Sequence, residues 1–175
     1  MTTPEHGKAA LLAQPSRRAF LVRVKPLGQD RVPIARETSE ITVGWGKADG
    51  LLDETLSRTE FAQRVASAYG GPDASSYALG QSIGHLWRFA REMHTGDLVV
   101  VPHGDTFHVG VIIGDATYDP ASGHEHWAYR RPVRWLNARP IPRQQAGPKL
   151  RRPMRSQGTT ADISKALDEI RDLIT

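Results

Sequence analysis

A tryptophan held between two glycines is the residue of this sequence best placed for binding chemistry. Trp45 follows an apolar run and lies between Gly44 and Gly46, so neither neighbour has a side chain that can cover the indole ring. An uncovered indole can form a wall against which a flat ligand stacks. The alternative interpretation is a tryptophan packed in the core of a small barrel.

Two further aromatic residues flank the loop 119–126. Tyr118 precedes this loop and Trp127 follows it, beside a strongly basic segment. Loop side chains are better placed to contact a ligand than core side chains, so both are candidates for such contacts. Trp87 falls on the apolar stripe of a predicted helix and Trp135 lies in an alternating strand pattern, so these two are expected in the core.

The basic residues of the chain are unevenly placed. The formal net charge is +4 over 175 residues. The segment 128–155 contains no acidic residue and the basic residues Arg130, Arg131, Arg134, Arg139, Arg143, Lys149, Arg151, Arg152 and Arg155. Such a face is expected of a protein that binds a phosphate backbone, although a solvated basic surface has the same composition. We expect the contacts to a DNA backbone to come from Arg130, Arg131, Arg134 and Lys47.

The sequence contains no pattern typical of a catalytic or metal site. The chain has no cysteine, which excludes a disulfide framework, a cysteine nucleophile, an iron–sulfur site and a Cys-ligated zinc finger. Its seven histidines show no metal-site spacing, and neither a Gly-x-Ser-x-Gly elbow nor a Walker loop is present. We therefore expect a non-catalytic protein without cofactor or metal.

The pattern of apolar residues predicts an α+β domain. Strands are expected over 20–24, 41–45, 98–102, 107–113 and 127–136, with a hairpin turn between the third and fourth. Ser57 and Glu60 form a capping box that opens one helix, which ends at Gly70, and a second helix is expected over 76–93. This combination indicates a small, curved, antiparallel or mixed β-barrel flanked by helices.

Composition divides the chain into four segments. They are a flexible leader over 1–17, a compact domain over 18–142, a basic linker over 143–158 and an amphipathic helix over 159–175. The last helix is predicted from a capping box of Thr159 and Asp162 and from apolar residues on one face. That face could dock on this domain, pair with a second copy in a homodimer, or lead into a following domain.

Targeting signals are also missing from the sequence. No apolar run approaches the roughly 20 residues needed to span a bilayer. The N-terminus has no basic region before an apolar stretch, as a signal peptide would have. Together with the lack of cysteine, this favours a cytoplasmic protein that does not interact with membranes.

Five short motifs follow one another along residues 18–142. They are Gly44-Trp45-Gly46, then Gly84-His85-Leu86-Trp87-Arg88-Phe89 with Met93, then Gly96-Asp97-Leu98-Val99-Val100-Val101-Pro102, then His108-Val109-Gly110-Val111-Ile112, and finally Arg131-Pro132-Val133-Arg134-Trp135-Leu136. In this order they resemble the EVE-like and YTH-like branch of the PUA superfamily. The resemblance is to the N-terminal reader domains of Mrr- and McrBC-type modification-dependent restriction enzymes in particular.

The resemblance implies a small β-barrel that takes a modified base, flipped out of its duplex, into an aromatic cage. Trp45 with its flanking glycines matches one wall of that cage, and the segment from Tyr118 to Trp127 matches another. Ser82 lies close to where related domains place a polar contact to the base. The implied function is a non-catalytic module that reads modified double-stranded DNA and directs a nuclease domain or subunit to it. The modification expected is 5-methylcytosine or 5-hydroxymethylcytosine rather than N6-methyladenine.

Two other functions fit the same superfamily. A PUA-like protein that reads structured or modified RNA would use the same barrel and basic face. A small RNA-directed hydrolase would use His103, Asp105 or the loop that contains His124 and His126.

Overall fold

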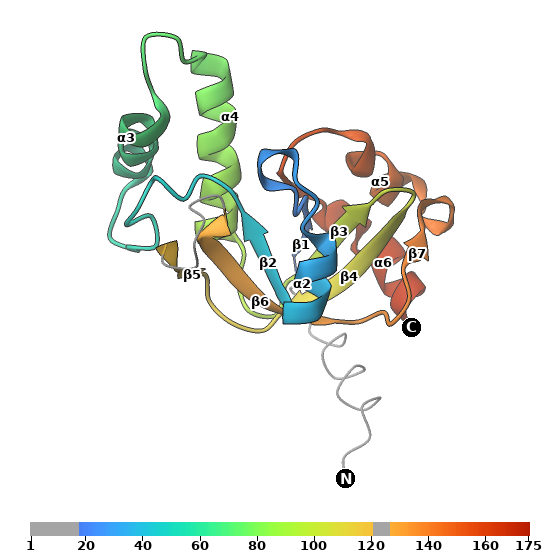
Figure 1. Ribbon diagram of the computed structural model, residues 1–175. Helices are drawn as coiled ribbons and strands as arrows, with labels where there is room; N and C mark the ends of the chain where they lie inside the picture. Colours follow the sequence, from blue (N-terminus) through green and yellow to red (C-terminus); the bar gives the residue numbers. More distant parts are fainter. Residues whose placement is uncertain (1–17, 121–126) are drawn as a thin grey trace.

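The computed structural model describes residues 18–120 and 127–175, which form an α+β fold on one curled, mixed sheet (Figure 1). The predicted leader 1–17 and the residues 121–126, with His124 and His126, lie outside the described residues. The sheet order is β2-β6-β4-β3-β1-β8, and β5 and β7 pair with β6 and β4. The bounds are Ala19–Val22 (β1), Glu40–Val43 (β2), Leu98–His103 (β3), Thr106–Ile112 (β4), Thr117–Tyr118 (β5), Tyr129–Trp135 (β6), Ile141–Pro142 (β7) and Thr160–Asp162 (β8). The predicted α+β class and the strongly curved sheet are confirmed.

The predicted hairpin is the centre of this sheet. β3 and β4 pair antiparallel over their full length, from Leu98 opposite Val111 to His103 opposite Thr106. Gly104 occupies the turn with a φ of +54°, a conformation that favours glycine. β1 pairs with β3 in parallel and with β8 in antiparallel orientation, so residues near the two ends of the described chain are neighbours in the sheet.

The sheet is buried on both faces at β1 and β3, because successive side chains of a strand point to opposite faces. Phe20 and Val99 belong to one apolar core, while Leu21 and Val100 belong to the other. The second core is closed by short helices from the last third of the chain. Burial on both faces explains the unbroken apolar run of β3.

Two helices cover the first core, on the side of the sheet where Figure 1 shows α3 and α4. α3 (Arg58–Tyr69) begins with the predicted capping box, in which the Ser57 hydroxyl accepts from the Glu60 amide and the Glu60 carboxylate accepts from the Ser57 amide. α4 (Ser76–Trp87) continues as a π-helical turn, Arg88–Glu92. The Met93 amide closes this turn by donating a hydrogen bond to the Arg88 carbonyl at 3.1 Å. Both predicted helices are therefore confirmed.

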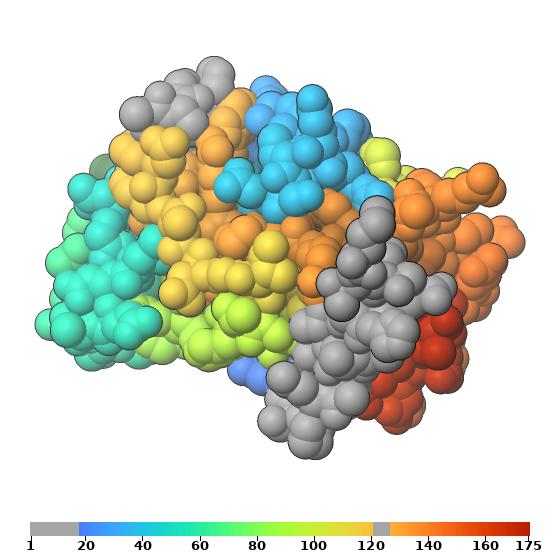
Figure 2. All heavy atoms as spheres, turned by 90° about the horizontal axis from the view of Figure 1, so that it is seen from below, coloured from blue at the N-terminus to red at the C-terminus, as the bar shows by residue number. Residues whose placement is uncertain are grey.

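A third helix on this part of the sheet, α2 (Val32–Thr38), was not predicted from the sequence. It lies against the end of β6, because the Trp135 indole donates to the Ala35 carbonyl at 3.3 Å and Arg36 donates to the Ala138 carbonyl at 3.3 Å. Figure 2 shows the light-blue α2 segment beside the orange segment that follows β6.

The segment expected as a basic linker, 143–158, is instead part of the folded domain. It forms α5 (Pro148–Arg151) between two single-turn helices, Arg143–Gln145 and Pro153–Arg155. Leu150 and Met154 are buried in the second core, and the Glu169 carboxylate accepts from the Lys149 and Leu150 amides at 3.1 and 2.9 Å. Lys149, Arg151, Arg152 and Arg155 are exposed on this segment, which two apolar residues and one capping carboxylate hold in place.

The segment expected as one helix, 159–175, is divided. Thr160–Asp162 forms β8, and the helix α6 begins only at Leu167 and ends at Ile174, after a single turn at Ser164–Ala166. Ile163, Ala166, Ile170 and Ile174 are buried in the second core. The apolar face that motivated a homodimer is thus covered by this domain itself, which is one of the three alternatives the sequence left open.

Candidate ligand pocket at Trp45

Trp45 lies in a tight turn after β2, with a left-handed φ of +68°. A bulky residue with positive φ is an outlier and costs roughly 1–2 kcal/mol. Contacts on several sides hold the turn in place. The Ala48 amide donates to the Trp45 carbonyl at 3.1 Å, the Lys47 amide donates to the Tyr69 hydroxyl at 2.9 Å, and the Tyr118 hydroxyl donates to the Gly46 carbonyl at 2.7 Å.

A cavity of about 370 Å³ lies beside the half-buried Trp45 ring. Its lining comes from the strand-to-helix segment after β1, the Trp45 turn, the end of α3 and the residue before β8: Arg23, Lys25, Pro26, Leu27, Gly44, Trp45, Lys47, Tyr69 and Thr159. The size is that of small-ligand sites in proteins. An indole, a phenol ring and apolar Pro26 and Leu27 suit a flat ligand, and three cationic side chains suit phosphate beside it.

His85 on α4 supports the Trp45 ring. The two rings lie 6.2 Å apart between centroids at an interplanar angle of 22°. The Thr160 amide donates to His85 Nδ1 at 3.2 Å, and a backbone amide can only donate, so Nδ1 carries no proton. Burial lowers the pKa of His85, which keeps the ring neutral at neutral pH with its proton on Nε2.

Among the described residues, the three predicted cage aromatics do not meet in one cavity. Tyr118 packs its ring against Tyr129 at 4.8 Å between centroids and uses its hydroxyl to support the Trp45 turn. Trp127 is buried, lies under the Arg31 guanidinium at 3.9 Å, and lines a separate cavity of about 50 Å³. Tyr118 is therefore a positioning residue for the turn, and Trp127 belongs to a different surface.

Ser82 also lies away from the Trp45 cavity. Its hydroxyl donates to the Ala78 carbonyl one turn earlier, at 3.1 Å. His85 lies three residues further on, on the same face of α4, and it is the residue of this helix that stacks on Trp45. The base contact expected of Ser82 stays a prediction, while the residue of α4 that contacts the Trp45 ring is His85.

The predicted backbone contacts of β6 fall on two faces of the strand. Arg131 is buried, and its Nε donates to the Phe89 carbonyl at 2.8 Å, at the π-helical turn after α4. Burial lowers its pKa to about 10. Because alternate residues of a strand face opposite ways, Arg130 and Arg134 point to the other side. Arg131 is therefore a structural residue and is removed from the predicted DNA contacts.

The side chains of the other predicted cations are less buried than that of Arg131. Arg130 pairs with Glu40 at 3.5 Å and donates to the Trp127 carbonyl at 3.2 Å, while Arg134 is exposed. Lys47 is exposed on the Trp45 turn and lines the Trp45 cavity. The basic residue that the structure adds to the pocket is Arg23, which follows β1. A single arginine after a strand carries no sequence signal that would place it at this pocket.

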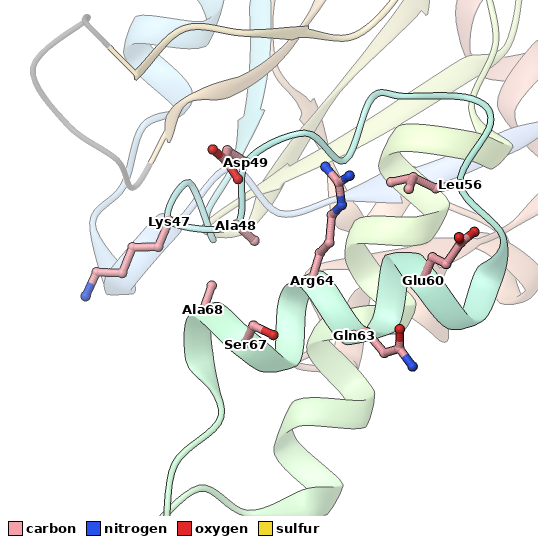
Figure 3. Close-up of a pocket in the computed structure, with 9 residues that line it drawn as sticks. All are labelled: Lys47, Ala48, Asp49, Leu56, Glu60, Gln63, Arg64, Ser67 and Ala68. Atoms are coloured by element: carbon pink, nitrogen blue, oxygen red, sulfur yellow. The ribbon is translucent and has the colours of Figure 1, made fainter.

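Lys47 also borders a different groove, of about 490 Å³, between the 47–56 loop and α3 (Figure 3). Figure 3 shows Arg64 reaching from α3 toward the loop, where its Nη1 donates to the Gly50 carbonyl at 3.4 Å. Asp49 and Glu60 balance the two cations of this groove, and its lining has no aromatic ring. It therefore has neither the stacking surface nor the excess positive charge of the Trp45 cavity.

Two kinds of feature were not found in the parts of the chain that the structure describes. Over 18–120 and 127–175, no three His, Asp or Glu side chains lie close enough together to share a metal ion. Over the same ranges, no helix combines the length and the apolar character that a membrane crossing requires.

These features define a small α+β protein with a partly apolar pocket whose lining includes three cationic side chains. The chain belongs to the family described as Domain of unknown function (DUF8426), whose model matches residues 30–151. A search of curated proteins finds no match. The matched range runs from before α2 to the end of α5, so β1, β8 and one side of the Trp45 cavity come from residues outside it.

Proposed function

We propose that this protein is a non-catalytic, PUA-like reader of modified double-stranded DNA, which holds a flipped base against Trp45. The observation that carries the proposal is a bulky aromatic residue in a left-handed turn, beside a cavity of about 370 Å³ whose rim contributes Arg23, Lys25 and Lys47. Backbone strain of this kind is concentrated at functional sites, because packing alone favours relaxed conformations. A nuclease domain or subunit acting on the recognised DNA belongs to the same proposal.

At such a site, the free-energy cost of extruding a base is similar in size to the free energy gained by binding it. Extruding a base from a duplex costs a few kcal/mol, and stacking on one aromatic ring returns roughly 1–3 kcal/mol. With one stacking wall rather than a full cage, the cations at the rim must supply the remainder through phosphate contacts. The protein is therefore expected to prefer its modified site modestly and to lose affinity steeply with salt. A 5-substituted cytosine is the favoured base.

The test is a fluorescence-polarisation titration of one duplex in four forms: unmodified, 5-methylcytosine, 5-hydroxymethylcytosine and N6-methyladenine, with an RNA of the same sequence beside them. Trp45→Gly removes the ring but keeps a residue that adopts φ +68° without strain, so it should remain folded. Tyr77→Ala is the matched control, because Tyr77 is an aromatic residue, 78% exposed, that does not line the cavity.

Wild type should bind one modified duplex more tightly than the unmodified one. Trp45→Gly should lower affinity for that duplex about 5- to 150-fold while Tyr77→Ala leaves it unchanged, because one stacked base is worth about 1–3 kcal/mol. Unaltered discrimination in Trp45→Gly would refute the role of this ring. Tighter binding of the RNA than of every duplex would replace DNA by RNA as the ligand.

A further inference from the structure

A second cavity, of about 220 Å³, adjoins the Trp45 cavity. The two share Arg23 and Lys25 in their linings. The second cavity adds Arg143 from the segment after β7, His103 from the end of β3 and Asp30 from the segment that precedes α2. One arginine and one lysine therefore stand between two hollows of different character, the first apolar and aromatic, the second polar.

The second cavity has an excess of positive charge. Asp30 is the one carboxylate in its lining, and its Oδ2 lies 2.8 Å from His103 Nε2 while its Oδ1 accepts from the Val32 amide at 3.0 Å. Among the described residues, no carboxylate forms an ion pair with Arg23, Lys25 or Arg143. No carboxylate of the described residues therefore neutralises the charge of these three side chains by direct contact.

The two guanidinium groups also converge on one another. Arg23 Nη2 donates to the Met154 carbonyl at 2.8 Å and to the Ser156 carbonyl, and Arg143 Nη1 reaches the same Met154 oxygen at 3.4 Å. Burial and the like charge of Arg143 lower the pKa of Arg23. Neutral carbonyl oxygens orient these groups but do not cancel their charge.

We propose that this second cavity is a phosphate subsite, so that the ligand is a nucleotide unit with its base on Trp45 and its phosphate between Arg23, Lys25 and Arg143. Guanidinium groups suit phosphate because their donors match its oxygens in a planar fork. A volume of about 220 Å³ is several times the roughly 30 Å³ share of one water, which leaves room for a phosphate group. The binding of a base on Trp45 rests on the proposed function, whereas the binding of a phosphate is argued from the charges of the second cavity.

The test scans one labelled duplex carrying a single 5-methylcytosine, in which each linkage near the modified base is replaced in turn by an uncharged methylphosphonate. Binding is measured by fluorescence polarisation with wild type and Arg143→Gln. Arg151→Gln is the matched control, because the Arg151 side chain, like that of Arg143, donates to backbone carbonyls, here at 2.8 and 2.7 Å, but does not line the cavity.

One methylphosphonate position should weaken wild-type binding about tenfold and weaken binding by Arg143→Gln clearly less, because the variant has already lost one of the three cationic contacts to that phosphate. For Arg143→Gln, the slope of log affinity against log salt concentration should be smaller by the equivalent of about one phosphate contact. The Tm of this variant should not fall, because the substitution removes the charge repulsion between Arg143 and Arg23. Arg151→Gln should behave as wild type in the scan.

The proposal is overturned if every linkage affects wild type and Arg143→Gln alike, or if Arg151→Gln reproduces the loss. A lower Tm with unchanged phosphate dependence would assign Arg143 a structural role instead. If unmodified and modified duplexes bind equally while one linkage still depends on Arg143, the phosphate subsite stands and the reading of the base fails. Failure to bind any duplex refutes both.

Discussion

His108 should make the protein unstable in mild acid, although it lies apart from the Trp45 cavity. The ring is 4% exposed on β4, packs edge-on against Trp135 with 5.9 Å between centroids, and meets the Asn137 side-chain nitrogen at 3.3 Å from its Nδ1. Burial first, and then the charges of Arg36 and His103, lower its pKa from 6.5 to about 4. Between these two pKa values, His108 is protonated in the unfolded chain but neutral in the folded protein.

The direction and size of the effect follow from linkage. A basic group with a depressed folded pKa contributes its stability above the unfolded pKa of 6.5, and that stability is lost as the pH falls toward the folded pKa of about 4. At pH 5 the unfolded imidazole is almost fully protonated and the folded one is mostly neutral. The resulting loss of unfolding free energy relative to pH 7.5 is about 2 kcal/mol.

Urea unfolding at pH 7.5 and pH 5 measures this loss. His108→Gln removes the titrating group, so the variant should lose about 2 kcal/mol less than wild type between the two pH values. The comparison uses the change with pH and not the absolute stability, because the substitution also alters packing. His85, whose pKa is lowered as well, is present in both proteins and cancels. Equal losses in wild type and variant would show that His108 is not protected from protonation.

Two further substitutions test structural residues of the fold. Arg131→Met should lower the unfolding free energy by about 2–4 kcal/mol, because it leaves the carbonyl oxygens of Phe89 and Ala90 without this donor; a chemical denaturation midpoint equal to that of wild type would contradict the structural role of Arg131. Leu27→Gly should be more stable than Leu27→Ala by about 1 kcal/mol, because Leu27 has a φ of +51°; calorimetry that ranks the alanine variant higher would show that the turn relaxes.

Local signals in the sequence predicted the elements whose residues decide their own conformation. The Ser57 and Glu60 capping box and the 3.6-residue stripe of α4 act within one helix, and the β3–β4 hairpin closes over a two-residue turn. Thr159 and Asp162 have the same spacing as a capping box, yet Thr160–Asp162 becomes a strand because it completes the edge of β1. A pairing partner so far away along the chain leaves no mark in the local pattern.

The candidate site was predicted in part for the same reason. Trp45 was found because its two flanking glycines are a local feature. Arg23 and His85 join it only through the packing of β1 and α4 against the same turn, which the sequence does not encode within any short window. Arg131 was misassigned because charge counts do not distinguish the two faces of a strand, and only the register of β6 shows that its side chain turns inward.

The position of β1 between β3 and β8 has a consequence for how the chain acquires its structure. The strand pairs through Phe20 with Val99 and with Asp162, so its two ladders close loops of very different length. Loop closure over long stretches slows folding, and a chain emerging from the ribosome cannot complete the sheet until the residues of β8 have been made. Until then one edge of β1 has unpaired backbone amide and carbonyl groups, and such an edge is a site at which a strand of another chain can pair.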